Sequence, residues 1–226
     1  MKTEKPIIYC IPGTGVDGRV FSLLDFGDYE VKYIHWVVPH KRESMNDYAL
    51  RLAKQIDASR PIVLIGLSFG GMLCATLMSH LDPKLVILIS SCKSKKELPP
   101  KIRFLKAIPF YRLFPDAAFI KAAAFSRKIF GFHNKADAAL FLDMLKTAPR
   151  NFYSRAIDCI VHWDAKDFKP GVVHIHGTRD RVLPLSFVKA DYVIEGGSHN
   201  MLNTHHDEIS RIIRKELEAV AMNLHD

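Results

Sequence analysis

The interpretation of this chain starts from residues 63–72, which read VLIGLSFGGM. An apolar run short enough to be a buried strand leads into Gly-x-Ser-x-Gly, and an apolar segment to about His80 predicts a helix after it. A sharp turn between strand and helix leaves little room for side chains, so Gly66 and Gly70 have a steric reason to be glycine. The turn also pushes Ser68 clear of the backbone. We therefore expect Ser68 to face a ligand.

The residues that follow Ser68 favour anion stabilisation over phosphate binding. The backbone N–H of Phe69 lies at the predicted helix start, where unpaired donors and the helix dipole can stabilise an oxyanion. A phosphate loop would need Gly-Lys-Ser/Thr at its end, but residues 70–72 contain no lysine. A tight strand-to-helix turn without chemistry is the remaining alternative.

Length and composition indicate a folded protein of one sizeable domain. The chain has 226 residues, 48% of them hydrophobic, and a mean hydropathy of +0.01, which is typical of a globular α/β protein. No apolar run approaches the roughly 20 residues of a membrane span, and residues 6–11 are too short for the core of a signal peptide. We expect residues 6–11 to be part of a strand.

The cysteines indicate a reducing compartment. The four cysteines lie far apart without a Cys-x-x-Cys pair, and each lies in an apolar segment where it can pack as a small hydrophobic residue: Cys10, Cys74, Cys92 and Cys159. We expect a cytoplasmic protein.

The net charge of +8 is concentrated in one region. Eleven lysines and arginines lie between Lys93 and Lys135, against only Glu97 and Asp116. Such an excess predicts a basic surface with a possible anionic partner, such as a substrate on an anionic carrier or at an anionic membrane. A solvated basic face without a partner is the alternative. Nucleic-acid binding is not favoured, because these residues alternate with phenylalanines and no recognised motif accompanies them.

Predicted strands and helices alternate at both ends of the chain. The expected strands are residues 5–11, 29–38, 63–67, 85–91, 172–177 and 192–194; the expected helices between and after them are residues 19–24, 44–56, 69–80 and 204–222. Residues 85–89 form a continuous aliphatic run, which is typical of a parallel strand covered on both faces. The pattern predicts a doubly wound α/β fold with a mainly parallel sheet of about six strands flanked by helices. Thr204 and Asp207 are a possible capping pair for the last helix.

A helical insertion interrupts this alternation. Prolines separate helical patches at residues 101–107, 116–130, 135–148 and 151–163. We expect residues 94–169 to form a helical cap over the carboxyl edge of the sheet, and residues 1–93 and 170–226 to form the core. The phenylalanines of this region are expected mainly in the core of the cap, with one or two at a substrate site: Phe104, Phe110, Phe114, Phe119, Phe125, Phe130 and Phe132.

Three residues with the chemistry of a nucleophilic site follow three predicted strands. Ser68, Asp180 and His199 each lie in a loop behind a strand, so a parallel sheet places them at one edge. The less favoured alternatives are that Asp180 is an ordinary turn aspartate and that His199 caps the last helix. The competing carboxylates, Asp158, Asp164 and Asp167, belong to the insertion or its exit.

The chain resembles the α/β-hydrolase fold family over nearly its whole length outside the insertion. The resemblance rests on four stretches: PGTG at 12–15, GLSFGG at 66–71, HGTRD at 176–180 with Pro184, and GSH at 197–199. It implies Ser68 as nucleophile, His199 as base and Asp180 as acid. It also implies an oxyanion hole formed by the N–H groups of Thr14 and Phe69.

No cofactor or metal is expected. His174 and His176 share a strand face, but no carboxylate or cysteine stands at ligand spacing, so buried or hydrogen-bonded histidines are expected instead. The leading functional hypothesis is a serine hydrolase that cleaves a carboxylic ester or thioester of a small or acyl-chain substrate through an acyl-serine intermediate. The alternatives are an acyltransferase or carbon–carbon bond hydrolase with the same three residues, and a non-catalytic ligand-binding protein. The oligomeric state is left open.

Overall fold

The computed structural model describes residues 5–132, 134–165 and 171–223. In these residues six strands form one parallel sheet in the order β2-β1-β3-β4-β5-β6. The strands are β1 (Ile7–Ile11), β2 (Val31–Tyr33), β3 (Ile62–Leu67), β4 (Leu85–Ile89), β5 (Val172–Gly177) and β6 (Tyr192–Ile194). The predicted parallel α/β architecture of about six strands is confirmed.

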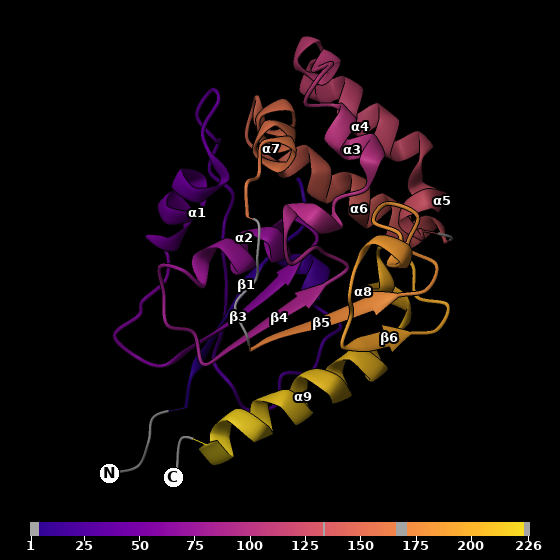
Figure 1. Ribbon diagram of the computed structural model, residues 1–226. Helices are drawn as coiled ribbons and strands as arrows, with labels where there is room; N and C mark the ends of the chain where they lie inside the picture. Colours follow the sequence, from indigo (N-terminus) through magenta and orange to yellow (C-terminus); the bar gives the residue numbers. More distant parts are fainter. Residues whose placement is uncertain (1–4, 133, 166–170, 224–226) are drawn as a thin grey trace.

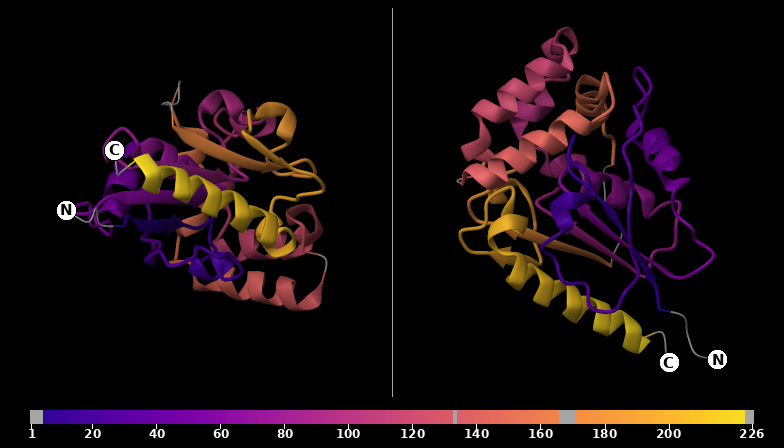
Figure 2. Two further views of the ribbon diagram at one scale, coloured as in Figure 1. Left: turned by 90° about the horizontal axis from the view of Figure 1, so that it is seen from below. Right: turned by 180° about the vertical axis from the view of Figure 1, so that it is seen from behind.

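Helices cover both faces of the sheet. The helices of the core are η1 (Gly18–Phe21), α1 (Met45–Ala53), α2 (Phe69–Leu77), η4 (Leu185–Phe187), α8 (Met201–Thr204) and α9 (His206–Asn223). Helices α1 and α2 lie on one face, and α9 lies on the opposite face (Figures 1 and 2). All residues of β1, β3 and β4 are therefore buried, as their uninterrupted apolar sequences predict.

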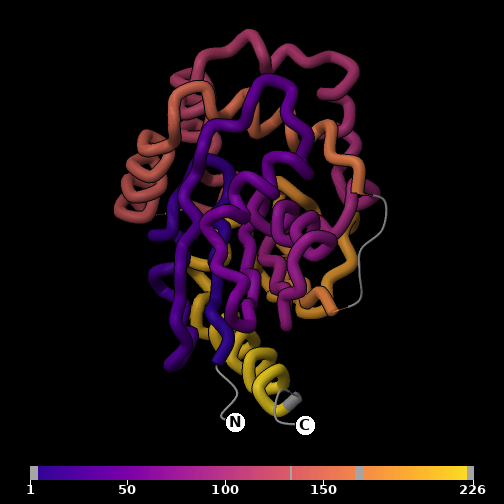
Figure 3. Tube along the Cα trace, turned by 90° about the vertical axis from the view of Figure 1, so that its left-hand side faces the viewer, coloured from indigo at the N-terminus to yellow at the C-terminus, as the bar shows by residue number. Residues whose placement is uncertain are grey.

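The chain between β4 and β5 forms helices, which we call the helical segment (residues 95–161). Its elements are η2 (Lys95–Glu97), α3 (Pro100–Phe104), η3 (Phe110–Leu113), α4 (Asp116–Phe125), α5 (Arg127–Phe130), α6 (Lys135–Thr147) and α7 (Phe152–Val161). Most of the segment lies beyond the carboxyl ends of the strands (Figures 1 and 3). The predicted boundary between residues 169 and 170 falls outside the described residues, as do residues 1–4 and 224–226 of the predicted core.

The second strand is shorter than predicted. We expected residues 29–38, but β2 ends at Tyr33. Ile34 still donates to the carbonyl of Cys10 at 2.9 Å. The backbone of His35 then bonds the side chain of Gln55 through both its N–H (2.9 Å) and its carbonyl (3.0 Å). A side chain thus replaces a neighbouring strand, and the ladder ends.

Two helices also differ from prediction. The helix expected over residues 116–130 is broken at Ser126 into α4 and α5. Phe125, which we expected in the core of the cap, is 92% exposed, and Phe104, Phe110 and Phe114 are at least half exposed. The last helix was expected from Thr204, but α9 begins at His206. The hydroxyl of Thr204 bonds the ring of His205 at 2.8 Å, so it does not form the predicted capping pair.

The four cysteines are buried free thiols, as their apolar surroundings predict. None of the helices in the described ranges is long and apolar enough to cross a membrane.

Candidate active site

The turn between β3 and α2 holds Ser68 in a strained conformation. Ser68 has φ +53° and ψ −116°, which is unusual for a residue with a side chain. Glycines make this turn possible, because a Cβ on Gly66 would lie 2.5 Å from the backbone of Gly70, and one on Gly70 would lie 2.0 Å from the carbonyl oxygen of Ile11. The steric reason inferred for both glycines is confirmed.

A second serine, which sequence reasoning missed, supports the turn. The hydroxyl of Ser91 donates to the carbonyl of Ser68 at 2.6 Å, and Ser91 is fully buried. It follows Ser90, which has a positive φ of 47°. The sequence did contain a signal for this role, because two serines follow the aliphatic strand. A buried hydroxyl there needs a hydrogen-bond partner.

The structure brings together the three side chains that the sequence placed behind separate strands. The Nε2 atom of His199 lies 3.0 Å from the Oγ atom of Ser68. The Nδ1 atom of His199 lies 2.7 Å from the Oδ2 atom of Asp180. A carboxylate bound to Nδ1 directs the lone pair of Nε2 towards the hydroxyl. The arrangement can therefore take a proton from Ser68.

Asp180 is buried and fully engaged by donors. Its side chain is 0% exposed, and its Oδ1 atom accepts hydrogen bonds from the N–H groups of Val182 (2.9 Å) and Leu183 (2.8 Å). Burial by itself raises the pKa of this carboxyl, but the charge and hydrogen bond of His199 and the backbone donors outweigh it, so the pKa lies below its usual value. Asp180 is thus ionised at neutral pH.

The competing carboxylate Asp158 lies in a different environment. It accepts hydrogen bonds from the hydroxyl of Tyr111 and from the guanidinium of Arg112, both at 2.5 Å. These bonds join α7 to η3 inside the helical segment. Asp164 forms an ion pair with Lys95, and Asp167 lies outside the described residues.

The two histidines of β5 are buried and hydrogen-bonded, as expected. His176 Nε2 lies 2.7 Å from the carbonyl oxygen of Leu183 and 3.4 Å from Asp180 Oδ2. His176 Nδ1 lies 3.1 Å from Nε2 of His174. Sequence reasoning did not connect this pair with Asp180, because the contact depends on the fold of the turn at residues 180–183.

Two backbone amides near Ser68 have no acceptor among the residues that the structure describes. Within the described ranges, the N–H groups of Thr14 and Phe69 donate no hydrogen bond. Thr14 belongs to the loop after β1, and a Cβ added to its neighbour Gly13 would lie 3.6 Å from the Cβ of Ser68. The ring of Phe69 is held between aromatic rings, with centroids 5.5 Å from Trp36 and 6.1 Å from Tyr48. Both amides can therefore donate a hydrogen bond to an anionic ligand atom.

A cavity of about 410 Å³ opens beside Ser68 and His199, a size within the usual range of small-molecule sites. Most of its wall comes from apolar side chains of the helical segment, which include Phe119, Phe130, Phe132, Phe141, Tyr153 and Ile157. None of the described residues that line it is an aspartate, glutamate, lysine or arginine. The cavity therefore suits an uncharged apolar group.

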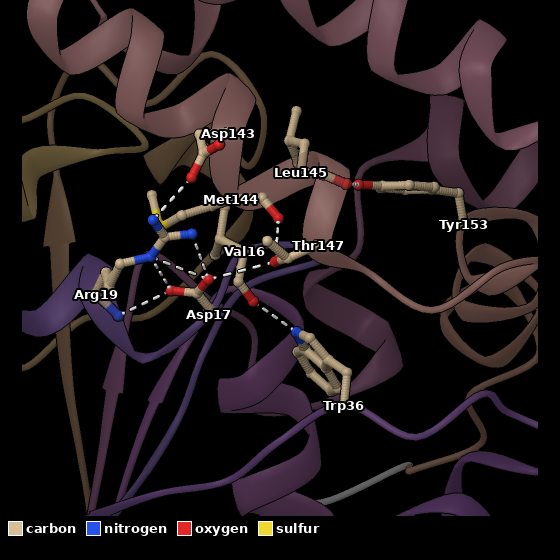
Figure 4. Close-up of polar contacts among 9 residues, drawn as sticks. All are labelled: Val16, Asp17, Arg19, Trp36, Asp143, Met144, Leu145, Thr147 and Tyr153. Carbon is tan, nitrogen blue, oxygen red and sulfur yellow. Dashed lines mark hydrogen bonds and ion pairs between the residues drawn. The ribbon is translucent and has the colours of Figure 1, made fainter.

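The helical segment contacts the loop that carries Thr14. Asp17 binds the guanidinium of Arg19 through both carboxylate oxygens, and Arg19 also binds Asp143 of α6 at 2.8 Å (Figure 4). The hydroxyl of Thr147 lies 3.3 Å from Asp17. The hydrogen bonds from Arg19 lower the pKa of Asp17. The loop is therefore joined to α6 by charged groups.

The same segment contacts the loop of His199. The N–H of Asn200 donates to the carbonyl of Phe130 at 2.9 Å, and the rings of Phe130 and His199 lie 6.1 Å apart. Gly131 approaches Ser198 so closely that a Cβ on it would lie 1.9 Å from the serine hydroxyl. The loop of His199 and the helical segment form one packed unit.

Comparison with known families agrees with the observed fold. The model of a family described as the alpha/beta hydrolase family matches residues 6–212. The chain belongs to the alpha/beta hydrolase family. This confirms the resemblance drawn from the four sequence stretches. A search of curated protein sequences finds no significant match.

Solved structures similar to this alpha/beta hydrolase share its fold at low sequence identity. A hydrolase from Pseudomonas aeruginosa PA01 is 14% identical, with a TM-score of 0.73 over 94% of this chain and 90% of that one. An enol-lactonase from Burkholderia xenovorans LB400 is 16% identical, with a TM-score of 0.72 over 95% and 92%. A thermophilic esterase from Thermogutta terrifontis is 15% identical, with a TM-score of 0.71 over 96% and 90%. At these identities the comparison concerns the fold alone.

Proposed function

We propose that this alpha/beta hydrolase cleaves carboxylic esters or thioesters through an acyl-serine intermediate. The proposal rests on one observation: Ser68, His199 and Asp180 are joined by hydrogen bonds of 3.0 and 2.7 Å at the mouth of an uncharged cavity. Ester chemistry is also named for solved structures of this fold, including the thermophilic esterase.

In the proposed mechanism, Oγ of Ser68 attacks the carbonyl carbon while Nε2 of His199 takes the hydroxyl proton. The negative charge on the former carbonyl oxygen is stabilised by the N–H groups of Thr14 and Phe69. The intermediate collapses, His199 returns its proton to the departing alcohol or thiol, and the acyl group stays on Ser68. Water activated by His199 then releases the acid and restores the hydroxyl.

The lining of the cavity limits which acyl groups we propose for the substrate. An acyl group in this space contacts phenylalanine and isoleucine side chains and no permanently charged group of the described lining. Burying such a group gains about 25 cal/mol per Å² of apolar surface, whereas a buried unpaired carboxylate or ammonium is strongly disfavoured. We therefore propose an uncharged, apolar acyl group. We also propose that residues 94–169 act as the cap over it.

The function is tested by replacing the nucleophile. Ser68→Ala is expected to keep the fold and lower hydrolysis of a short aryl ester by roughly 10³-fold or more. Ser59→Ala is the matched control and should hydrolyse as wild type does, because Ser59 is exposed and lies before β3, at the opposite end of that strand from Ser68. A fluorophosphonate should label wild type and not Ser68→Ala. Wild-type turnover in Ser68→Ala would remove Ser68 from the mechanism.

The leaving group is proposed to be anionic. The helical segment exposes several cations that form no ion pair within the described residues: Arg103, Lys106, Lys121, Arg127 and Lys128. Helix α4 carries only Asp116 as an acid, and that carboxylate accepts from the backbone of Asn151 and Tyr153. The outer surface is thus positive while the cavity is uncharged, which fits an apolar acyl group on an anionic carrier.

Salt dependence tests this narrower proposal. The value of kcat/KM for an acyl-coenzyme A should fall as ionic strength rises, because exposed charges are screened over about 10 Å at 0.1 M salt. The same acyl group on a neutral thiol should show little change. Lys121→Gln with Lys128→Gln should weaken only the reaction of the anionic thioester. Equal salt dependence for both substrates would rule out recognition of an anionic carrier.

A further inference from the structure

Two histidines of β5 lie behind Asp180, and the mechanism above uses neither of them. His174 and His176 are both 0% exposed. Their rings are nearly perpendicular, with centroids 5.0 Å apart. Buried imidazoles that serve only as packing could be replaced by apolar rings at less cost, because every buried ring nitrogen needs a hydrogen-bond partner.

The hydrogen bonds determine which nitrogen carries the proton. The carbonyl oxygen of Leu183 can only accept, so Nε2 of His176, 2.7 Å away, carries hydrogen. In a neutral ring the other nitrogen, Nδ1, must then accept. Its neighbour at 3.1 Å is Nε2 of His174, which therefore donates. Each histidine thus carries its proton on Nε2.

Both rings are neutral at physiological pH. Burial lowers the pKa of His176, and the charge of Asp180 only partly offsets this. Burial lowers the pKa of His174 to about 3, and His176 and Lys93 add to the effect, whereas Asp191 opposes it. Nδ1 of His174 forms no hydrogen bond within the described ranges. The backbone of Lys189 acts on the same ring and, like Asp191, partly opposes the lowering of its pKa.

His176 is linked to Asp180 through the turn at residues 180–183. The carbonyl of Leu183 accepts from His176, while the N–H of Leu183 donates to Oδ1 of Asp180 at 2.8 Å. Nε2 of His176 also lies 3.4 Å from Oδ2 of Asp180, the oxygen that binds His199. The strand, the turn and the carboxylate therefore form a closed set of contacts.

We propose that His176 is a positioning residue, whose Nε2–H holds the turn at residues 180–183 and thereby orients the Asp180 carboxylate towards His199. His174 has the supporting role of keeping the proton of His176 on Nε2. This inference rests on the proposed function, because it assigns a role relative to the same three residues. It adds a residue that touches neither the substrate nor Ser68.

The wild-type protein provides the first test. Long-range ¹H–¹⁵N spectra of ¹⁵N-histidine-labelled protein at neutral pH should show His174 and His176 as neutral rings with hydrogen on Nε2. A proton on Nδ1 of either ring, or a charged ring, would overturn the assignment. This measurement needs no variant and no substrate.

Variants of His176 provide the second test. His176→Phe keeps a ring but removes the donor, and we expect kcat to fall about tenfold or more while KM changes less than about twofold. His176→Gln should recover most of the loss, because its terminal amide nitrogen can reach the position of Nε2. The acid limb of kcat/KM should move to lower pH in His176→Phe, because an Asp180 carboxylate turned away from His199 stabilises the protonated ring less. His40→Phe, at an exposed histidine, is the control.

The outcomes separate this inference from the proposed function. If wild type shows no Ser68-dependent hydrolysis, the proposed function fails. The positioning role is then tested by the downfield ¹H NMR signal of the His199–Asp180 hydrogen bond. That signal should weaken in His176→Phe and return in His176→Gln. If wild type hydrolyses esters and both variants match its kcat and pH profile, the positioning role alone is wrong. If His176→Phe does not fold, His176→Gln with an unchanged proton spectrum supports the role, and a lost signal there refutes it.

Discussion

Replacing Gly70 by alanine should disturb the proposed oxyanion site more than the fold. A Cβ at this position would lie 2.0 Å from the carbonyl oxygen of Ile11 and 2.4 Å from that of Pro12. Carbon atoms normally keep about 3.5 Å from such neighbours, so α2 and the end of β1 must separate by about 1 Å or more. Thr14 follows β1 and Phe69 begins α2, so the separation moves their two amides apart. A misplacement of about 1 Å can cost about 100-fold in rate.

Two opposing terms set the effect of Gly70→Ala on stability. Alanine gains about 1 kcal/mol over glycine within a helix, whereas overpacking costs about 1–3 kcal/mol. We expect a net loss of up to about 2 kcal/mol in the free energy of unfolding and a fall in kcat of about 100-fold. Urea unfolding and aryl-ester kinetics measure the two quantities. Gly13→Ala is the stability control, because its Cβ would have ordinary contacts of 3.6 Å. A wild-type kcat for Gly70→Ala would refute the argument.

Two further predictions concern groups outside the proposed chemistry. His174 has a pKa lowered to about 3, so its contribution to stability is present above the unfolded value of about 6.5 and is lost as pH falls below it. The free energy of unfolding should therefore drop by about 2 kcal/mol between about pH 7.5 and about pH 5 because of this group. Urea titrations should show a shallower drop for His174→Asn. The same dependence of unfolding free energy on pH in both proteins would contradict the prediction. Arg19→Met removes the link from Asp17 to Asp143, whose side chains are 30% and 62% exposed, and should therefore cost less than about 1 kcal/mol. The difference from wild type should shrink in high salt, and a loss that salt does not change would show that packing of the Arg19 stem matters instead.

The sequence predicted the sheet and the candidate site because both depend on local patterns. Aliphatic runs gave the buried strands, and their common parallel direction placed the following loops at one edge. Ser68, Asp180 and His199 could be singled out because each belongs to such a loop. The family match confirms the fold that these patterns predicted.

The parts that the sequence did not predict depend on contacts between distant residues. β2 ends early because the side chain of Gln55 takes both backbone groups of His35. Phe125 is exposed although we expected it in the core of the cap. The contact of His176 with Leu183 requires the turn to fold back onto the strand. No periodicity in the chain encodes these distances.

The helical segment contacts two loops of the core so closely that it cannot shift without moving them. Its α5 end binds the loop of His199 through Asn200 and Phe130, and Tyr153 of α7 packs so closely against the loop of Thr14 that a Cβ on Gly15 would lie 2.4 Å from its ring. Gly15 also has φ +75°, so a side chain there would be strained as well as blocked. A displacement of the segment would therefore move the loops of His199 and Thr14 along with the cavity wall. Substitutions that alter the proposed acyl preference should be tolerated at the phenylalanines that line the cavity, because their side chains face the cavity. Substitutions at Gly15 or Gly131 should not be tolerated, because the segment packs against the two loops there.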